Sequence, residues 1–357
     1  MLSRLRKNIS IRKSRVMKRP PARERRRAGR AGFVEDRMTT VRELLERYQA
    51  KASLQSYGTV YQDTTEFMNI GYGDVIALGG RHYLVLRDEA ERRFGMEDPK
   101  FWVKRCTELE SGEKRILKLV FHERFNMKIG DMEVPCYRSP EKEARILDLT
   151  RGDPRFMQGF SLPDSAGNNV RVIEVVFGKR LDLAVDAIDC DHRTYFAEHF
   201  PGILANFLDA CEAIAFLHAK GERHGDIRRD HLFRHYDTGR YVWIDFDYTF
   251  DGSANPFGVD VFGLGNILLF LAGKGIHTAQ SLAETPGGRE ILSRVTPEDY
   301  SVMYRYRIMN LEKLFPYLPG PLCRVLQHYA VGSEVYYESA RELLDDLRPC
   351  LDRLRGA

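Results

Sequence analysis

Two aspartates stand nineteen residues apart in the stretch of sequence with the richest chemistry. Asp226 lies in His224-Gly225-Asp226-Ile227-Arg228-Arg229-Asp230-His231, and Asp245 lies in Trp243-Ile244-Asp245-Phe246-Asp247. Each aspartate neighbours an apolar strand or turn segment, and a long apolar helix is predicted after them. Phosphoryl transfer needs one carboxylate at the attacking hydroxyl and another on a magnesium ion. Two carboxylates in such surroundings could supply this pair.

A lysine in an apolar strand is the next chemical feature. Lys118 lies in the run Ile116–Phe121, where period-two alternation turns it toward the same face as apolar side chains. A lysine in such a place needs a partner or a route to water. Glu143 shares a helical face with Ile146 and Leu147, so it also points inward. We predict an ion pair between the two, the alternative being an edge-strand lysine that reaches water and an unrelated surface glutamate.

The elements that must position these groups come as strands first and helices later. Residues 74–121 are predicted as strands, the last two forming a hairpin. Ser139-Pro140 has the pattern of a helix start, and residues 203–220 form an amphipathic helix. Residues 261–271 are apolar on nearly all sides, which predicts a buried helix. This order predicts an α+β fold with a β-rich first lobe and an α-rich second lobe.

The motifs together resemble those of the protein-kinase-like superfamily. The segment at Asp226 is similar to the kinase sequence H-R-D-x-x-x-x-N, and the segment at Asp245 is similar to D-F-G. Lys118 is similar to the lysine of V-A-I-K, and Asp260 opens a segment similar to the helix start D-x-W-S-x-G. The resemblance covers roughly residues 75–350. It includes features of bacterial atypical Ser/Thr kinases and of lipopolysaccharide and aminoglycoside kinases.

The resemblance implies a two-lobed fold that binds ATP·Mg²⁺ between its lobes. It implies that Lys118 contacts the phosphates, that Asp226 orients or deprotonates the acceptor hydroxyl, and that Arg228 contacts the phosphoryl group. Asp260 is implied to brace the backbone of the catalytic loop. The residues expected around the metal are Asp245, Asp247 and His231.

The nucleotide is expected to contact the segment that joins the lobes. The strand Val172–Val176 should lead into a hinge at Phe177-Gly178, whose backbone would bind adenine. The loop expected to cover the phosphates is Arg87–Gly95, which contains a single glycine and so would act through charge. Besides Lys118 and Glu143, the residues expected to contact the nucleotide are Glu174, Val176, Phe177, Arg92 and Arg93.

Several positions depart from the kinase pattern. There is no G-x-G-x-x-G, and Gly225 replaces the arginine of H-R-D. His231 stands where the family has an asparagine, and imidazole is a poor magnesium ligand beside oxygen donors. Only fourteen residues separate Asp245 from Asp260, which is too short for a segment switched by phosphorylation. The alternative function is therefore a nucleotide-binding pseudokinase that acts as a switch or scaffold.

Composition and charge set the wider limits. The chain of 357 residues has a formal charge of +4, yet residues 1–30 carry thirteen Lys or Arg and one acid, so they are +12 and the remainder is −8. We interpret residues 1–37 as a disordered basic arm, either a non-structural extension or a contact for an anionic partner such as nucleic acid or lipid. Residues 38–72 are expected to be a helical extension, 73–177 the first lobe and 178–357 the second lobe.

The compartment is inferred from cysteine usage and hydropathy. The six cysteines are scattered with no C-x-x-C pair, which favours a reducing compartment, so a cytoplasmic protein is expected. No apolar run approaches the ~18 residues that a membrane helix needs. The expected partners are ATP and a hydroxyl acceptor, on a protein or on an envelope sugar or lipid.

Overall fold

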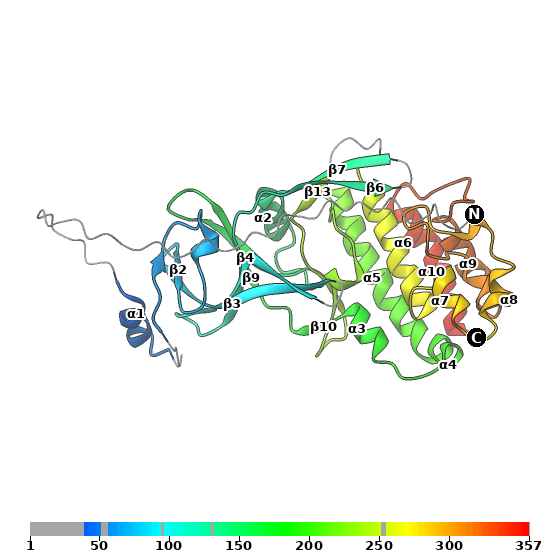
Figure 1. The fold of residues 1–357 in the computed structure, drawn as a ribbon, viewed down its shortest axis with the longest axis horizontal. Coiled ribbons are helices and arrows are strands. Elements are labelled where there is room, and N and C mark those ends of the chain that lie inside the picture. Colours follow the sequence, from blue (N-terminus) through cyan, green and yellow to red (C-terminus); the bar gives the residue numbers. More distant parts are fainter. Residues whose placement is uncertain (1–38, 51–55, 94–95, 130–131, 251–254, 357) are drawn as a thin grey trace, which may run out of the picture.

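The computed structural model describes residues 39–50, 56–93, 96–129, 132–250 and 255–356. It has a β-rich lobe and a helical lobe placed end to end along the longest axis (Figure 1). The α+β fold predicted from the sequence, with a β-rich first lobe and an α-rich second lobe, is therefore confirmed. The basic arm, residues 1–37, lies outside the described residues.

The first lobe is built on a seven-stranded sheet with the strand order β1-β2-β3-β4-β5-β9-β8. Its strands pair antiparallel except β1 and β2, which are parallel. Apolar side chains from its central strands form the core of this lobe. The strands are β1 Val60–Tyr61, β2 Val75–Leu78, β3 Arg81–Arg93, β4 Met96–Glu108, β5 Lys114–Lys118, β8 Gly159–Pro163 and β9 Asn169–Glu174.

The described residues of the segment 38–72 join this lobe, and they are helical only in part. Helix α1, Val41–Arg47, begins at a capping box made by Thr40 and Glu43, and a single turn, η1, covers Phe67–Asn69. The apolar face of α1 packs on side chains from β2 and β3. Because β1 also comes from this segment, the expected helical extension contributes a strand to the sheet.

The expected covering loop, Arg87–Gly95, is wrong as a loop. Residues up to Arg93 belong to β3, which pairs with β4 as far as the register Arg93↔Met96. Opposite charges face each other across the two strands: Lys104 bonds Asp88 at 2.7 Å, and Lys100 lies 3.4 Å from Glu91. Cross-strand pairs of this kind stabilise paired strands, so these charged residues support a long β3–β4 hairpin.

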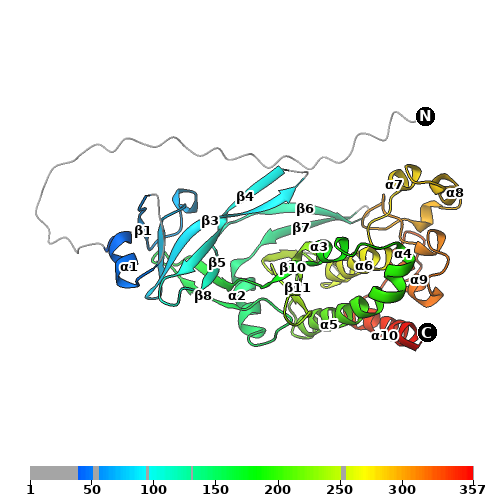
Figure 2. The same cartoon turned by 90° about the horizontal axis from the view of Figure 1, so that it is seen from below.

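A second hairpin was not foreseen from the sequence. Strands β6, Arg124–Ile129, and β7, Met132–Arg138, lie between β5 and the next helix, and β7 pairs with β13, Tyr248–Phe250. The hairpin extends from the first lobe toward the helices of the second (Figure 2). The segment after Asp245 is therefore partly a strand held by the first lobe.

Helix α2, Pro140–Leu149, confirms the predicted helix start. The side chain of Ser139 accepts a hydrogen bond from the backbone N–H of Lys142, and Pro140 occupies the first turn, where its missing N–H has no cost. Glu143 on this helix is fully buried, as the pattern predicted.

The second lobe is a helical core behind a small sheet. The predicted helices 203–220 and 261–271 appear as α5, Phe200–Ala219, and α6, Gly258–Gly273, and α10, Ala340–Gly356, packs beside α5. The sheet order is β10-β11-β12, with β10 Gly178–Arg180, β11 Leu232–His235 and β12 Tyr241–Trp243. The remaining elements are α3 Leu181–Asp186, α4 His192–Thr194, η2 Tyr195–His199, η3 Arg229–His231, α7 Ala279–Ala283, α8 Gly288–Leu292, η4 Pro297–Asp299, η5 Leu311–Lys313 and α9 Gly320–Gln327.

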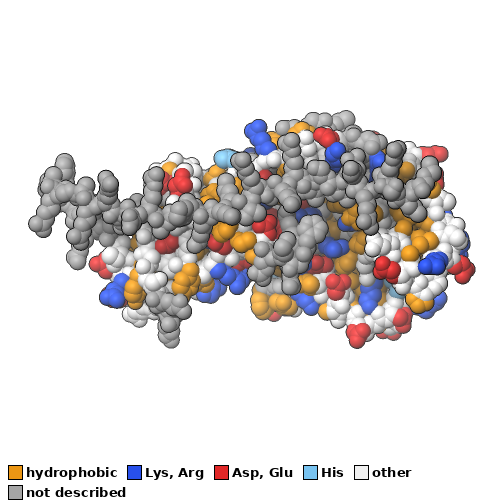
Figure 3. Space-filling model, viewed as in Figure 1, with side chains coloured by type: hydrophobic (Ala, Val, Ile, Leu, Met, Phe, Trp, Pro, Cys, Tyr) orange, Lys and Arg blue, Asp and Glu red, His pale blue; other side chains and the backbone are white. Residues whose placement is uncertain are grey.

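One helical stretch has the length and apolar composition of a membrane span. Among the described residues this is His192–Ala219, and 56% of its most apolar window is buried inside the protein. Its α5 portion packs in the main hydrophobic core against α6 and α10. On the outer face seen in Figure 3, acidic and basic side chains are interspersed among apolar ones.

Candidate active site

A cavity of 310 Å³ lies between the two lobes. The first-lobe strands β3, β4, β5 and β9 form one wall, and residues near the small β10-β11-β12 sheet form the other. Of the residues predicted from the sequence, those that line it are Lys118, Glu174, Val176, Arg228, His231 and Asp245. The strand, hinge and loop segments chosen for their spacing therefore converge on one cleft.

Lys118 is the charge centre of this cleft. Its Nζ lies 2.6 Å from Glu143 Oε1, bonds Asp245 Oδ1 directly, and lies 3.7 Å from Asp247 Oδ2. Burial by itself would lower the pKa of Lys118, but the carboxylates of Asp245, Asp247 and Glu143 together raise it. The predicted ion pair between Lys118 and Glu143 is confirmed, and the amine remains charged.

Glu143 has a second cation that sequence analysis missed. Arg171 Nε donates to Glu143 Oε2 at 3.1 Å, and Arg171 is almost fully buried. In the sheet Arg171 on β9 is the direct neighbour of Lys118 on β5. The signal was present, because a charged residue in the apolar strand Asn169–Glu174 needs a partner for the same reason as Lys118 does.

Asp245 lies two residues after strand β12 and has a left-handed backbone conformation, with φ at 69°. This conformation is strained for a residue other than glycine, and such strain gathers at functional sites. Burial opposes ionisation, but the ammonium of Lys118 holds the pKa of Asp245 well below its ordinary value. The carboxylate is therefore ionised and available to a cation.

Asp247 is held by an arginine of the second hairpin. Arg138 Nη1 donates to Asp247 Oδ2 at 2.6 Å, and the guanidinium also contacts Glu123 and stacks on Tyr248 and Trp102. The other carboxylate oxygen, Asp247 Oδ1, is buried and has no hydrogen-bond partner among the described residues. Sequence reasoning missed Arg138 because β7 was not predicted.

His231 does not fit the metal role that its position suggested. Its Nδ1 lies 2.9 Å from the carbonyl oxygen of Asp226, and its Nε2 lies 3.1 Å from Arg228 Nη2 and 3.4 Å from Asp245 Oδ2. With Nδ1–H donating to the carbonyl, Nε2 is left as acceptor for the guanidinium. No group of three or more metal-ligating side chains forms in the described part of the chain. His231 therefore orients its neighbours by hydrogen bonds.

The oxygen atoms of Asp245 and Asp247 fit a magnesium ion. Magnesium in phosphoryl-transfer sites takes one or two carboxylates, and substrate phosphates and water fill the rest. Asp245 is ionised, and Asp247 offers a buried oxygen with no other partner among the described residues. A protein cage of three ligands is not required for an ion that arrives with its phosphates.

The loop that carries Asp226 is braced from below by Asp260. The carboxylate of Asp260 is fully buried and accepts from the backbone N–H of His224 at 2.7 Å and of Gly225 at 2.8 Å. The bracing implied by the motif is therefore present. Burial raises the pKa of Asp226, whose Oδ2 lies 3.5 Å from His231 Nδ1. Burial also lowers the pKa of His224 to about 3, so that ring is neutral.

Arg228 reaches across the cleft. Its Nη2 lies 2.9 Å from Glu91 on β3 and 2.8 Å from Asp230 in its own loop. Glu91 is also the partner of Lys100 on β4. This cross-lobe pair places the β3–β4 hairpin over the position where Arg228 was expected to meet phosphate. Arg92 and Arg93 lie further along the same strand, and their side chains are outside the described residues.

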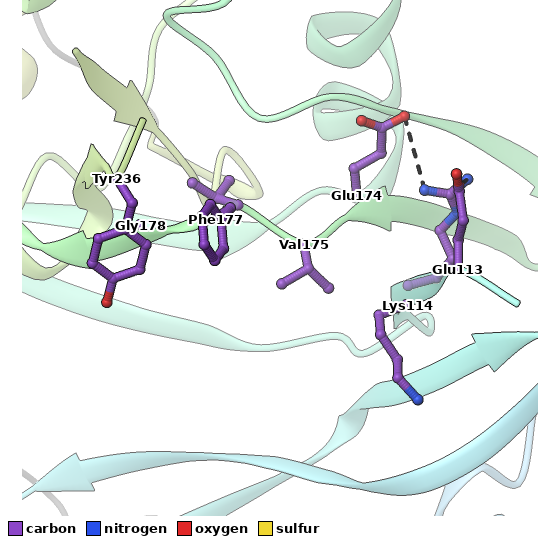
Figure 4. Close-up of a pocket in the computed structure, with 9 residues that line it drawn as sticks. Glu113, Lys114, Glu174, Val175, Phe177, Gly178 and Tyr236 are labelled. Carbon is purple, nitrogen blue, oxygen red and sulfur yellow. Dashed lines mark hydrogen bonds and ion pairs between the residues drawn. The ribbon is translucent and has the colours of Figure 1, made fainter. Parts of the chain in front are cut away.

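The hinge passes Val176 and turns outward at Phe177. Val176 lines the cleft, and neither its N–H nor its C=O is hydrogen-bonded within the part of the chain that the structure describes. Phe177 is 58% exposed and packs on Tyr236, with ring centroids 4.9 Å apart. Figure 4 shows the two rings at one end of a neighbouring 440 Å³ pocket, with Glu174 toward the other. Phe177 thus lies beside the predicted nucleotide cleft and does not line it.

Comparison with known proteins gives a structural likeness and no sequence match. No family model matches the chain, and no curated protein matches its sequence. Among solved structures it is similar to "Crystal structure of Rad53 1-466 in complex with AMP-PNP", at 16% identity and a TM-score of 0.43. The match covers 68% of this chain and 60% of that chain, so it spans less than two thirds of that protein.

Proposed function

We propose that this protein is a cytoplasmic, ATP-dependent phosphotransferase that moves the γ-phosphoryl group of ATP to a hydroxyl. The observation that carries the proposal is the convergence of Lys118, paired with Glu143, and the ionised Asp245 on one cleft beside the braced loop of Asp226. Phosphoryl transfer depends mainly on positioning and charge, so these few groups suffice.

Each group has a role that follows from its place. Lys118 binds the α- and β-phosphates, and the free backbone of Val176 binds adenine. Asp226, with a pKa raised by burial, orients the acceptor hydroxyl and takes its proton. Arg228 neutralises charge on the transferred group once it leaves Glu91. Asp245 and Asp247 hold the Mg²⁺ that accompanies ATP, and this ion supplies positive charge to the phosphates.

The acceptor is proposed to be a hydroxyl of a protein serine or threonine, or of an envelope sugar or lipid. The segment between Asp245 and Asp260 is short and is partly committed to strand β13. It therefore offers little surface to an extended peptide, and we expect a compact or folded acceptor.

A second candidate function is a nucleotide-binding pseudokinase. The observation in its favour is that Lys118 and Arg228, the two cations for phosphate, are both paired with carboxylates, Asp245 and Glu91. His231 also stands where the metal-binding asparagine of the motif is expected. Such a protein would bind ATP and transfer nothing.

Two aspartate variants separate these functions. The purified protein is incubated with labelled ATP and Mg²⁺, with and without cell extract. Asp226→Asn should bind ATP·Mg²⁺ and lose at least about 100-fold in transfer, because the amide cannot take the proton of the acceptor hydroxyl. Asp245→Asn should lose the magnesium-dependent part of ATP binding.

The matched control is Asp237→Asn, at an exposed aspartate in the turn between β11 and β12. It should bind and transfer as the wild type does. If the wild type binds ATP but labels no fraction, or if neither active-site variant changes ATP consumption, the pseudokinase function is favoured.

A further inference from the structure

Lys142 is a buried lysine that the proposed chemistry does not use. It precedes Glu143 on α2 and is 2% exposed. Its Nζ donates to three backbone carbonyl oxygens, those of His224 at 2.8 Å, Phe246 at 2.9 Å and Tyr248 at 2.6 Å. All three protons of the ammonium therefore have backbone acceptors.

These carbonyls belong to the two segments that carry the acids of the site. His224 lies two residues before Asp226, and Phe246 lies between Asp245 and Asp247. One side chain thus bonds both segments at the same nitrogen. Because the acceptors are main-chain atoms, the bonds constrain the path of the backbone itself.

We infer that Lys142 is a positioning residue that fixes the catalytic loop against the acidic segment and ties both to the helix that carries Glu143. The inference rests on the proposed phosphotransferase function for its catalytic consequence. A displacement of about 1 Å between reacting groups can cost about 100-fold in rate. Loss of the ammonium should therefore reduce turnover, while the nucleotide contacts of Lys118 and the hinge remain.

Gly225 leaves the space that the backbone of Tyr248 and the ammonium of Lys142 occupy. Its φ is 88°, and a Cβ there would overlap the carbonyl oxygen of Tyr248 and lie 3.2 Å from Lys142 Nζ. The loop therefore has no room for a side chain at the position where H-R-D has arginine. The cation that joins the catalytic loop at Asp226 to the segment at Asp245 is Lys142 of helix α2.

The first lobe holds the acidic segment at further points. Strand β13 pairs with β7, and the backbone N–H of Ser139 donates to the carbonyl oxygen of Asp247 at 2.7 Å. Thr249 in β13 is buried. The segment is therefore assembled by contacts that are internal to the fold, with no phosphate needed to order it.

The test compares Lys142→Met with Lys104→Met. Lys104 is also a fully buried lysine, bonded to the carbonyl oxygen of Ile70 at 2.6 Å and to Asp88, and it does not line the cleft. Lys142→Met should lower kcat about 100-fold and change the KM for ATP by less than about threefold. Lys104→Met should leave both within about threefold of the wild type.

Hydrogen exchange provides a readout that does not depend on activity. Amides in residues 224–231 and 245–250 should exchange faster in Lys142→Met than in the wild type, and those in Lys104→Met should not. If Lys142→Met fails to fold, Lys142→Gln takes its place: the shorter amide keeps donors but reaches fewer carbonyls, so the same changes should appear in weaker form.

Three results would overturn the inference. They are an equal loss of kcat in the two methionine variants, a change in KM for ATP in place of kcat, and unchanged exchange in both segments. A wild type with no ATP turnover removes the proposed function, and the exchange measurement then decides the inference by itself.

Discussion

Replacing Lys118 by methionine perturbs the centre of the site with little change in volume. Three carboxylates lie around the amine that is lost. Glu143 and Asp247 each keep an arginine at hydrogen-bond distance, whereas Asp245 loses the cation that contacts it directly. Removing one partner of a buried ion pair costs about 3–5 kcal/mol. Since two of the three carboxylates remain paired, we expect the lower end, about 3 kcal/mol.

The melting temperature provides the measure of this cost. A loss of 1 kcal/mol lowers it by about 2–4 °C in a protein of 150–250 residues, so a fall of about 6–12 °C is an upper range for this longer chain. The double variant Lys118→Met with Asp245→Asn removes both charges, so it should recover at least half of the loss. A recovery of this kind identifies the uncompensated carboxylate as the cause.

The same assay reports nucleotide binding. ATP·Mg²⁺ at 100 times its Kd should stabilise the wild type by about 2.7 kcal/mol, and the shift should be mostly absent in Lys118→Met. If Lys118→Met has the same melting temperature as the wild type, Asp245 does not depend on Lys118 as its partner, and the reasoning is refuted. An unchanged response to ATP would show instead that the nucleotide does not contact this lysine.

Two further variants test the loop before Asp226. Gly225→Ala should lower the free energy of unfolding by more than about 1 kcal/mol, because alanine is strained at this φ and its Cβ would overlap the carbonyl oxygen of Tyr248. The measurement is denaturant unfolding, and the control is Gly202→Ala on α5, where a Cβ meets no other atom within 4 Å. His224, whose pKa is lowered from its ordinary 6.5 to about 3 by burial, contributes stability that is complete above pH 6.5 and is lost as the pH falls from 6.5 toward 3, by up to about 5 kcal/mol. Unfolding at pH 7, 5 and 4 should therefore show a shallower acid loss in His224→Phe, and equal slopes would refute the assignment.

Features set by local pattern could be predicted from the sequence. The orientation of Lys118 follows from strand alternation, and that of Glu143 follows from its place on a helix whose cap is explicit in Ser139-Pro140. The brace made by Asp260 was available through the motif that contains it. In each of these cases a few neighbouring residues determine where the side chain points.

Features set by distant pairing could not be predicted in this way. Strand β13 exists because residues 248–250 pair with β7, more than a hundred positions earlier in the chain. Arg138 finds Asp247 through that pairing. Lys142 gave no signal because its acceptors are backbone carbonyls, which every sequence has, and lysine in the first turn of a helix is usually exposed.

The charge pattern of the first long hairpin was recognised but assigned to the wrong structure. The stretch Arg87–Gly95 has one glycine and many charges, and this pattern predicts a loop that meets phosphate through arginine. In the fold these charges pair across strands, as Asp88 does with Lys104 and Glu91 with Lys100. Such pairs stabilise the two strands beside the cleft, and Glu91 on β3 lines that cleft.

Charge balance in the cleft explains why this hairpin matters to the proposed function. Arg228 is bonded to Glu91, and Lys118 is bonded to Asp245, so both cations are neutralised by carboxylates of the protein. A nucleotide that arrives with Mg²⁺ brings phosphates for the two cations and a cation for the carboxylates. Under the proposed function, binding would be an exchange of partners, in which Asp245 would pass from Lys118 to the metal and Arg228 from Glu91 to phosphate. Because Glu91 is carried by β3, the same exchange would free the hairpin from the catalytic loop and so couple nucleotide binding to the position of the first lobe.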